Sequence, residues 1–163
     1  MVDQPVAEGV DFALALYRED GRWVVESMPP RVAADLRTLV TALRQRPGDA
    51  GAIGLVSVDE DFFVAVRVLG PDVRLLLSDV TAATEWPLAR EVLDHLGLPL
   101  PDDDDQIQPA GEIGIFADLG AGPMDVAAIC DDVDLYPEEM LAEVADRLGI
   151  AREYAQAVET ALG

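Results

Sequence analysis

The chain has 163 residues, half of them apolar, and this length and composition suffice for a globular protein with a hydrophobic core. Its formal net charge of −21 argues against direct nucleic-acid binding, because such binding depends on basic contacts to phosphates. It has one cysteine, no lysine, no apolar run of about 18 residues and no secretory signal pattern at its start. We therefore expect a cytoplasmic protein without an internal disulfide, a P-loop or a membrane span.

Residues 1–98 have the pattern of an α+β sheet domain. Alternating or continuous apolar residues predict strands over residues 10–16, 23–26, 52–58, 62–69 and 73–77. A helix is predicted to open at the prolines and to place its apolar residues on one face, namely Pro29, Pro30, Val32, Leu36, Leu39, Val40 and Leu43. A second helix is predicted over residues 87–96, and Gly97 ends it.

This order, ββαβββα, predicts a five-stranded antiparallel sheet with two helices, in which the last three strands form a meander. In topology it resembles the longin and roadblock folds, in which a five-stranded antiparallel sheet is flanked by helices. The resemblance implies an interaction platform of the kind used in trafficking and small-GTPase regulation. Because a fold does not transfer a function, the resemblance is used for shape.

The remainder of the chain is predicted to be a linker followed by a small helical domain. Residues 99–111 are rich in proline and contain four consecutive aspartates, which predicts an exposed acidic linker. Residues 112–163 predict short helices after Pro123, over residues 137–148 and over residues 151–162. About 50 residues in short helices are marginal as an independent unit, so we expect support from the first domain, another subunit or a partner.

Negative charge is concentrated in the second part of the chain. Residues 1–100 carry 16 acidic residues against 9 arginines, whereas residues 101–163 carry 16 against 2. A surface with this charge attracts a basic protein surface, so we expect the helical part to bind a basic protein partner. The acids that we take as candidates for this contact are Asp131, Asp132, Asp134, Glu138, Glu139 and Glu143.

Trp86 is a further candidate for partner binding. It precedes Pro87, and the residue before a proline is biased out of the helical conformation. A large aromatic side chain at a helix start either packs against the helix or remains available for contact with another protein. Both interpretations stay open at this point.

No residue pattern marks a catalytic, cofactor or metal site. His95 lies near a predicted helix end without a marked partner, and acidic neighbours would raise the pKa of the Cys130 thiol. The acids at 131–139 lack the spacing of a calcium-binding loop. An enzyme that uses the acids at 59–61 or 131–139 stays an alternative, and it would need a cleft that gathers them with shifted pKa values.

Three stretches, residues 54–63, 74–93 and 130–139, resemble the actinobacterial tRNA adenosine deaminase-associated proteins. The resemblance extends over nearly the whole chain and implies a tRNA adenosine deaminase as a candidate partner. It implies no catalytic residues. The chain is not expected to be a deaminase itself, because His95 is followed by Leu96 and Gly97 and Cys130 by two aspartates, so the zinc-ligand motifs are absent.

The expected function is therefore that of a non-catalytic acidic accessory protein without a cofactor. It would bind or regulate a tRNA adenosine deaminase through its acidic helical part. The alternative is a homodimeric scaffold, or a module similar to small-GTPase regulators, that uses the longin- or roadblock-like sheet.

Overall fold

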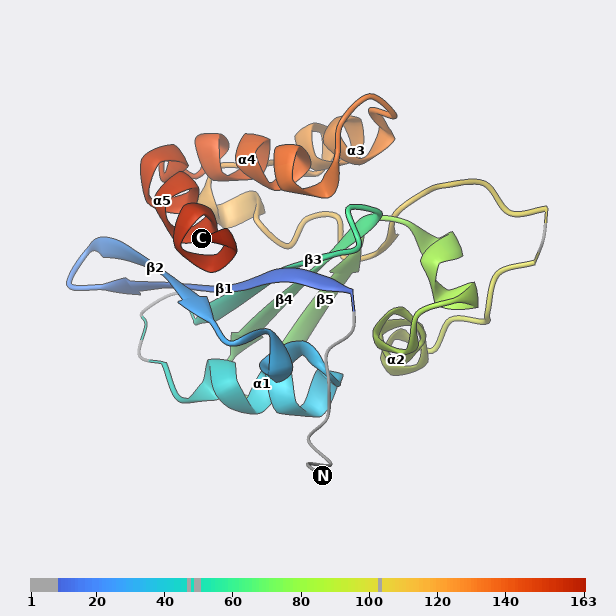
Figure 1. Cartoon of the computed structure of the whole chain (residues 1–163), viewed down its shortest axis with the longest axis horizontal. Helices are drawn as coiled ribbons and strands as arrows, with labels where there is room; N and C mark the ends of the chain where they lie inside the picture. Colours follow the sequence, from blue (N-terminus) through green and yellow to red (C-terminus); the bar gives the residue numbers. More distant parts are fainter. Residues whose placement is uncertain (1–8, 47, 49–50, 103) are drawn as a thin grey trace.

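The computed structural model describes residues 9–46, 48, 51–102 and 104–163. A six-stranded antiparallel sheet lies at its centre, with helices on both faces (Figure 1). Across the sheet the strands follow the order β2-β1-β3-β4-β5-β6. Their bounds are Val10–Glu19 (β1), Arg22–Met28 (β2), Ala52–Val58 (β3), Phe62–Leu69 (β4), Asp72–Leu77 (β5) and Ala110–Gly111 (β6). The α-helices are Leu36–Arg44 (α1), Pro87–Leu96 (α2), Pro123–Asp131 (α3), Pro137–Arg147 (α4) and Ala151–Leu162 (α5), and the 3₁₀ helices are Pro30–Ala33 (η1), Val80–Thr84 (η2) and Ala117–Leu119 (η3).

The α+β class and the order of the first five strands and two helices are confirmed. The meander of β3, β4 and β5 is antiparallel as predicted. The additional strand β6 lies inside the predicted linker, where Ala110 pairs with Leu77 and Gly111 with Leu76. Two residues are too few to show a hydrophobic period, so no sequence pattern marks this strand. The assignment to the longin or roadblock folds stays a prediction.

The first helix begins later than its prolines indicate. Pro30 opens the 3₁₀ turn η1, and α1 starts only at Leu36. Asp35 separates the two, because its extended backbone interrupts the helix and its Oδ1 accepts a hydrogen bond from the backbone N of Thr38 at 2.7 Å. The prediction of one helix from Pro29 onward is therefore wrong at this point, since this N-cap competes with a continuous helix.

The first face of the sheet packs against α1 and α2 (Figure 1). Val56 of β3 and Val66 of β4 lie in one buried cluster with Leu39 and Leu43 of α1. Gly54 of β3 allows α1 to approach closely, since a Cβ at this position would lie 3.0 Å from Cδ1 of Leu43. The residues that alternate with these on β3 and β4 must therefore lie on the opposite face.

That opposite face is covered by α3, α4 and α5 (Figure 1). Leu55 of β3 and Phe63 of β4 share a second buried cluster with Leu141 and Val144 of α4 and Tyr154 of α5. Of the three supports that the sequence leaves open for the helical part, the structure shows the first, which is packing on the sheet. The predicted boundaries at residues 98 and 111 stay predictions.

A buried arginine ties the sheet to the C-terminal part of the chain. Arg67 of β4 is 1% exposed. Its guanidinium donates hydrogen bonds to the backbone O of Ile115 at 3.0 Å and to both carboxylate oxygens of Asp118 at 2.6 and 2.9 Å. This hydrogen bonding lowers the pKa of Asp118 below its usual value. Because a buried charge is tolerated only when it is paired, Asp118 fixes η3 on the sheet.

A second arginine lies beside the first. Arg67 and Arg74 are directly opposite each other across β4 and β5, and like charges in this position destabilise a sheet. Asp118 offsets the charge of Arg67, and Glu112 lies 3.8 Å from Nε of Arg74. Part of the acidity after residue 100 therefore neutralises arginines of the sheet.

We expect Asp118→Ala to lower the free energy of unfolding by about 1 kcal/mol at neutral pH. The buried Arg67 loses its carboxylate, but the Asp118 side chain is 60% exposed, so water replaces part of this interaction. The pKa of Asp118 is lowered in the folded state, so its stabilisation is present above the unfolded value of 3.8 and is lost as the pH falls through the folded value. Urea unfolding at neutral and acid pH measures both effects. Asp146→Ala, which removes an exposed acid of α4, is the control, and equal losses in the two variants would contradict the expectation.

Candidate functional site

Two adjoining pockets form a groove where the turn between β3 and β4 meets the start of α4. Their volumes are about 380 and about 420 Å³, and Glu60 and Tyr136 line both. We call the two pockets together the acidic groove. Among the described residues that line it there is no arginine or histidine, whereas there are eight carboxylates, from Asp11, Glu60, Asp61, Asp79, Asp132, Asp134, Glu138 and Glu139.

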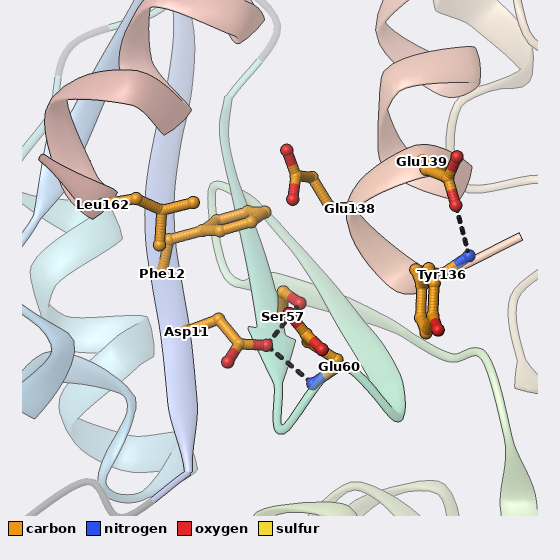
Figure 2. A pocket seen from close by; sticks show the side chains of 8 residues that line it. All are labelled: Asp11, Phe12, Ser57, Glu60, Tyr136, Glu138, Glu139 and Leu162. Carbon is orange, nitrogen blue, oxygen red and sulfur yellow. Dashed lines mark hydrogen bonds between the residues drawn. The ribbon is translucent and has the colours of Figure 1, made fainter.

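The turn between β3 and β4 supplies one side of the acidic groove. Asp59 and Glu60 have φ angles of 51° and 50°, in the left-handed region, which Asp adopts more readily than most residues. Asp11 of β1 holds this turn, because its Oδ2 accepts hydrogen bonds from Oγ of Ser57 at 3.0 Å and from the backbone N of Glu60 at 2.8 Å (Figure 2). One carboxylate on β1 thus fixes the position from which the turn presents its own acids.

The connection between α3 and α4 supplies the other side. Oδ1 of Asp132 accepts a hydrogen bond from the backbone N of Asp134 at 3.0 Å, which closes a local turn. Pro137 then begins α4, and Oε1 of Glu139 accepts a hydrogen bond from the backbone N of Tyr136 at 2.9 Å (Figure 2). These short-range bonds hold the acids at the groove and leave Tyr136 60% exposed.

Exposed apolar side chains gather at the same place. Seven large apolar side chains of the described residues are exposed, and four of them, Ile107, Val133, Tyr136 and Leu162, line the acidic groove. Val133 is 84% exposed. An acidic surface that only faces solvent does not require exposed apolar side chains. Apolar side chains surrounded by polar ones are typical of a protein interaction site.

The carboxylates of the groove influence one another. The pKa of Asp61 is raised above 3.8, first because its carboxylate loses part of its hydration, although the residue is exposed, and then by the negative charges of Asp79, Asp59 and Glu85. The ionised form of Asp61 is therefore less favourable here than in water. A cation brought into the groove by a partner would relieve this repulsion.

The structure brings together four of the acids that the sequence proposes for partner binding. Asp132, Asp134, Glu138 and Glu139 line the groove. Asp131 and Glu143 are also exposed but line neither pocket. Members of both acid sets of the alternative enzyme hypothesis, at residues 59–61 and 131–139, line this groove, although Asp59 and Asp131 do not.

Trp86, the remaining candidate, does not line the acidic groove. It is the N-cap residue of α2 and packs, half-buried, with the cluster on the α1 and α2 face of the sheet. The centroid of its ring lies 6.1 Å from the centroid of the Phe62 ring. Its buried Nε1 has no hydrogen-bond partner among the described residues. The assignment of all seven candidates to partner binding stays a prediction.

Several contributors to the groove are absent from the candidates that the sequence suggests, among them Asp11, Tyr136 and Asp79. Tyr136 precedes a helix-starting proline as Trp86 does, so the same pattern marks both aromatic residues. Asp11 and Asp79 have no such signal, because their place in the groove depends on which strands are neighbours in the sheet.

Histidine and cysteine are residue types that enzymes often use in catalysis, and the chain has one of each, His95 and Cys130. His95 is exposed near the end of α2 and does not line the groove. Cys130 lines the groove, but burial, and not the acidic neighbours that the sequence suggests, raises the pKa of its thiol to about 11, so the thiol is protonated at neutral pH. Within the described ranges, no three or more His, Cys, Asp or Glu side chains are arranged to hold a metal ion. In that same part of the chain, no helix has the length and apolarity to cross a membrane.

Fold and groove together define a small α+β protein whose exposed acids and apolar side chains meet at one site. The model of the Rv3753c-like tRNA adenosine deaminase-associated protein family matches residues 11–151. The chain is 36% identical over 162 residues to Protein Rv3753c of Mycobacterium tuberculosis (strain ATCC 25618 / H37Rv), an alignment that covers 97% of this chain and 94% of that protein. The chain therefore belongs to this family, which confirms the resemblance seen in its sequence. No solved structure matches it significantly.

We expect Asp61→Asn to stabilise the fold at neutral pH. The raised pKa of Asp61 means that its ionised form destabilises the folded state above the folded pKa, and that this effect disappears below the unfolded value of 3.8. The variant should therefore melt at a higher temperature than the wild type at pH 7 and at the same temperature once the acid is protonated in both states.

The control for this measurement is Asp72→Asn, which removes the same charge from an exposed position at the start of β5. Calorimetry of the three proteins over a range of pH separates a local effect from a general one. A similar gain in the two variants would mean that net charge, and not the surroundings of Asp61, sets the stability.

Proposed function

We propose that this protein is a non-catalytic accessory protein that binds a basic protein partner through the acidic groove, and that a tRNA adenosine deaminase is the candidate partner. The observation that carries the proposal is the concentration of eight carboxylates and four exposed apolar side chains at one groove, where no cationic side chain is found among the lining residues that the structure describes. The name of the family supports the choice of partner.

This combination suits a protein partner in two ways. The carboxylates attract and orient a basic surface during encounter, and the attraction falls with ionic strength. Exposed side chains such as Tyr136 and Val133 then supply apolar area that becomes buried in the complex. A direct contact with nucleic acid is disfavoured, since the same carboxylates would repel its phosphates.

Acid–base catalysis at the same groove is the less favoured reading. Its supporting observation is the raised pKa of Asp61 beside Asp79. Asp79 is buried, but Asp61, Glu60 and the acids of the α3–α4 connection and of α4 are exposed. Catalytic carboxylates act best where water is excluded, so this arrangement favours binding.

The alternative of a homodimeric scaffold, or of a module similar to small-GTPase regulators, uses a different surface. It is favoured by the position of β2 at the outer edge of the sheet, since an outer strand can pair with another chain. Sedimentation equilibrium at high protein concentration separates the two ideas. A dimer would support the scaffold, whereas a monomer would count against it.

We expect the purified protein to form a complex with the purified tRNA adenosine deaminase of the same organism at low ionic strength. The affinity should fall by roughly tenfold or more at about 1 M salt, where the Debye length is only about 3 Å. Isothermal titration calorimetry measures both values. Absence of a complex at low ionic strength would overturn the choice of partner.

A pair of charge-matched variants tests whether the groove makes this contact. The triple change Asp132→Asn, Asp134→Asn and Glu138→Gln removes three charges from the groove and should weaken the complex. The control is the triple change Asp102→Asn, Asp104→Asn and Asp105→Asn, which removes three exposed charges outside the groove. Equal weakening by the two would show that net charge alone drives the association.

A further inference from the structure

Helix α5 has more apolar surface than the sheet covers. Tyr154, Ala157 and Val158 are buried against the core of the molecule. Ala151 and Ala155 are exposed, and with Leu162 they continue the apolar surface along the helix at four- and seven-residue steps. In an α-helix this spacing places them on one face. The inner part of this apolar face of α5 therefore packs on the core, and its outer edge remains uncovered.

This outer edge forms one wall of an apolar groove between α4 and α5. The groove has a volume of about 510 Å³, and its floor and walls include Ala142, Ala155, Val158 and Leu162. We call it the helix groove. Its two helices are fixed to each other, because Oη of Tyr154 donates a hydrogen bond to the backbone O of Glu138 at 2.7 Å. A groove with firmly joined walls of this kind matches the surfaces that receive an amphipathic helix.

The charges around the helix groove specify what can occupy it. Glu138, Glu139 and Glu159 are exposed at its rim, and none of the described residues that line it is an arginine or a histidine. Glu138 and Glu139 line the acidic groove as well, so the two grooves are continuous at the start of α4. A second copy of this chain would bring a further net charge of −21 against the same acidic rim. Repulsion therefore disfavours self-association here, whereas basic side chains at the edges of an apolar helix face would meet opposite charge.

We propose that the helix groove receives an amphipathic helix of the partner protein, with its apolar face against α4 and α5 and with lysines or arginines beside the rim glutamates. This inference deepens the proposed function, on which it rests, by naming the kind of segment that the partner contributes. The acidic groove would then contact basic residues of the partner beyond the end of that helix.

The probe for this proposal is a synthetic peptide of about 18 residues, or five helical turns, with leucines on one face and lysines on the other. Fluorescence anisotropy of the labelled peptide, titrated with the full-length protein, gives its affinity. A scrambled peptide has the same composition and charge but no apolar face, and we expect it to bind roughly tenfold more weakly, because it cannot bury its leucines in the groove. Equal affinity of the two peptides would overturn the proposal.

Two variants with matched controls locate the binding. Ala155→Phe adds a large side chain at an exposed floor position, and it should reduce the affinity of the amphipathic peptide to that of the scrambled one without changing the latter. Glu159→Gln should weaken binding more than Glu153→Gln, which removes an exposed charge of α5 outside the groove. No effect of Ala155→Phe would overturn the proposal.

The binding of the deaminase and the binding of the peptide distinguish this inference from the proposed function. If the deaminase binds and the peptide does not, the proposed function stands and this inference fails. The opposite result would remove the deaminase as partner and leave the groove as a helix-binding site.

Discussion

The structure depends on two central strands that are apolar on both faces. Almost every residue of β3 and β4 is buried, and a sheet of this kind needs a cover on each side. Helices α1 and α2 cover one side, so α3, α4 and α5 must cover the other. This requirement brings the start of α4 beside the turn between β3 and β4, although the two are more than 70 residues apart in the chain. The acidic groove is a direct consequence of that packing.

The acidic residues in the second half of the chain fall into two groups with separate roles. Some of these acids balance arginines within the fold, as Asp118 does for Arg67 and as Asp125 does for Arg147 at 3.1 Å. Others, at the α3–α4 connection and the first turn of α4, have no arginine among their neighbours in the groove. A net charge counted along the sequence cannot distinguish these two groups. In the structure the second group lines the acidic groove, which is the surface that we propose for partner binding.

The sequence predicts those helices and strands whose apolar residues follow a clear pattern along the chain. Helices α4 and α5 have clear hydrophobic periods, strands β3 and β4 are nearly continuous apolar runs, and the predicted bounds of all four agree with the structure to within a residue. It does not predict β6, which is too short, or the break before α1, which depends on the N-cap at Asp35. Nor does it predict the groove, because residues as distant as Asp11 and Asp134 line it only after the sheet and helices have assembled. A charged residue such as Arg67 predicts that its position on β4 faces solvent. It is buried instead, because the later helices cover this face of the sheet.

The clustering of acids carries an energetic cost, and this cost is itself an argument for binding. The pKa of Asp61 is raised partly because other carboxylates lie near it, which means that the folded state is less stable at neutral pH than it would be with these charges dispersed. Exposed apolar side chains such as Val133 and Tyr136 add no stability while they face water. Selection for stability alone would disperse the first group and replace the second. Both features become favourable when a basic, partly apolar surface covers the groove, because the same contact neutralises the carboxylates and buries the apolar side chains.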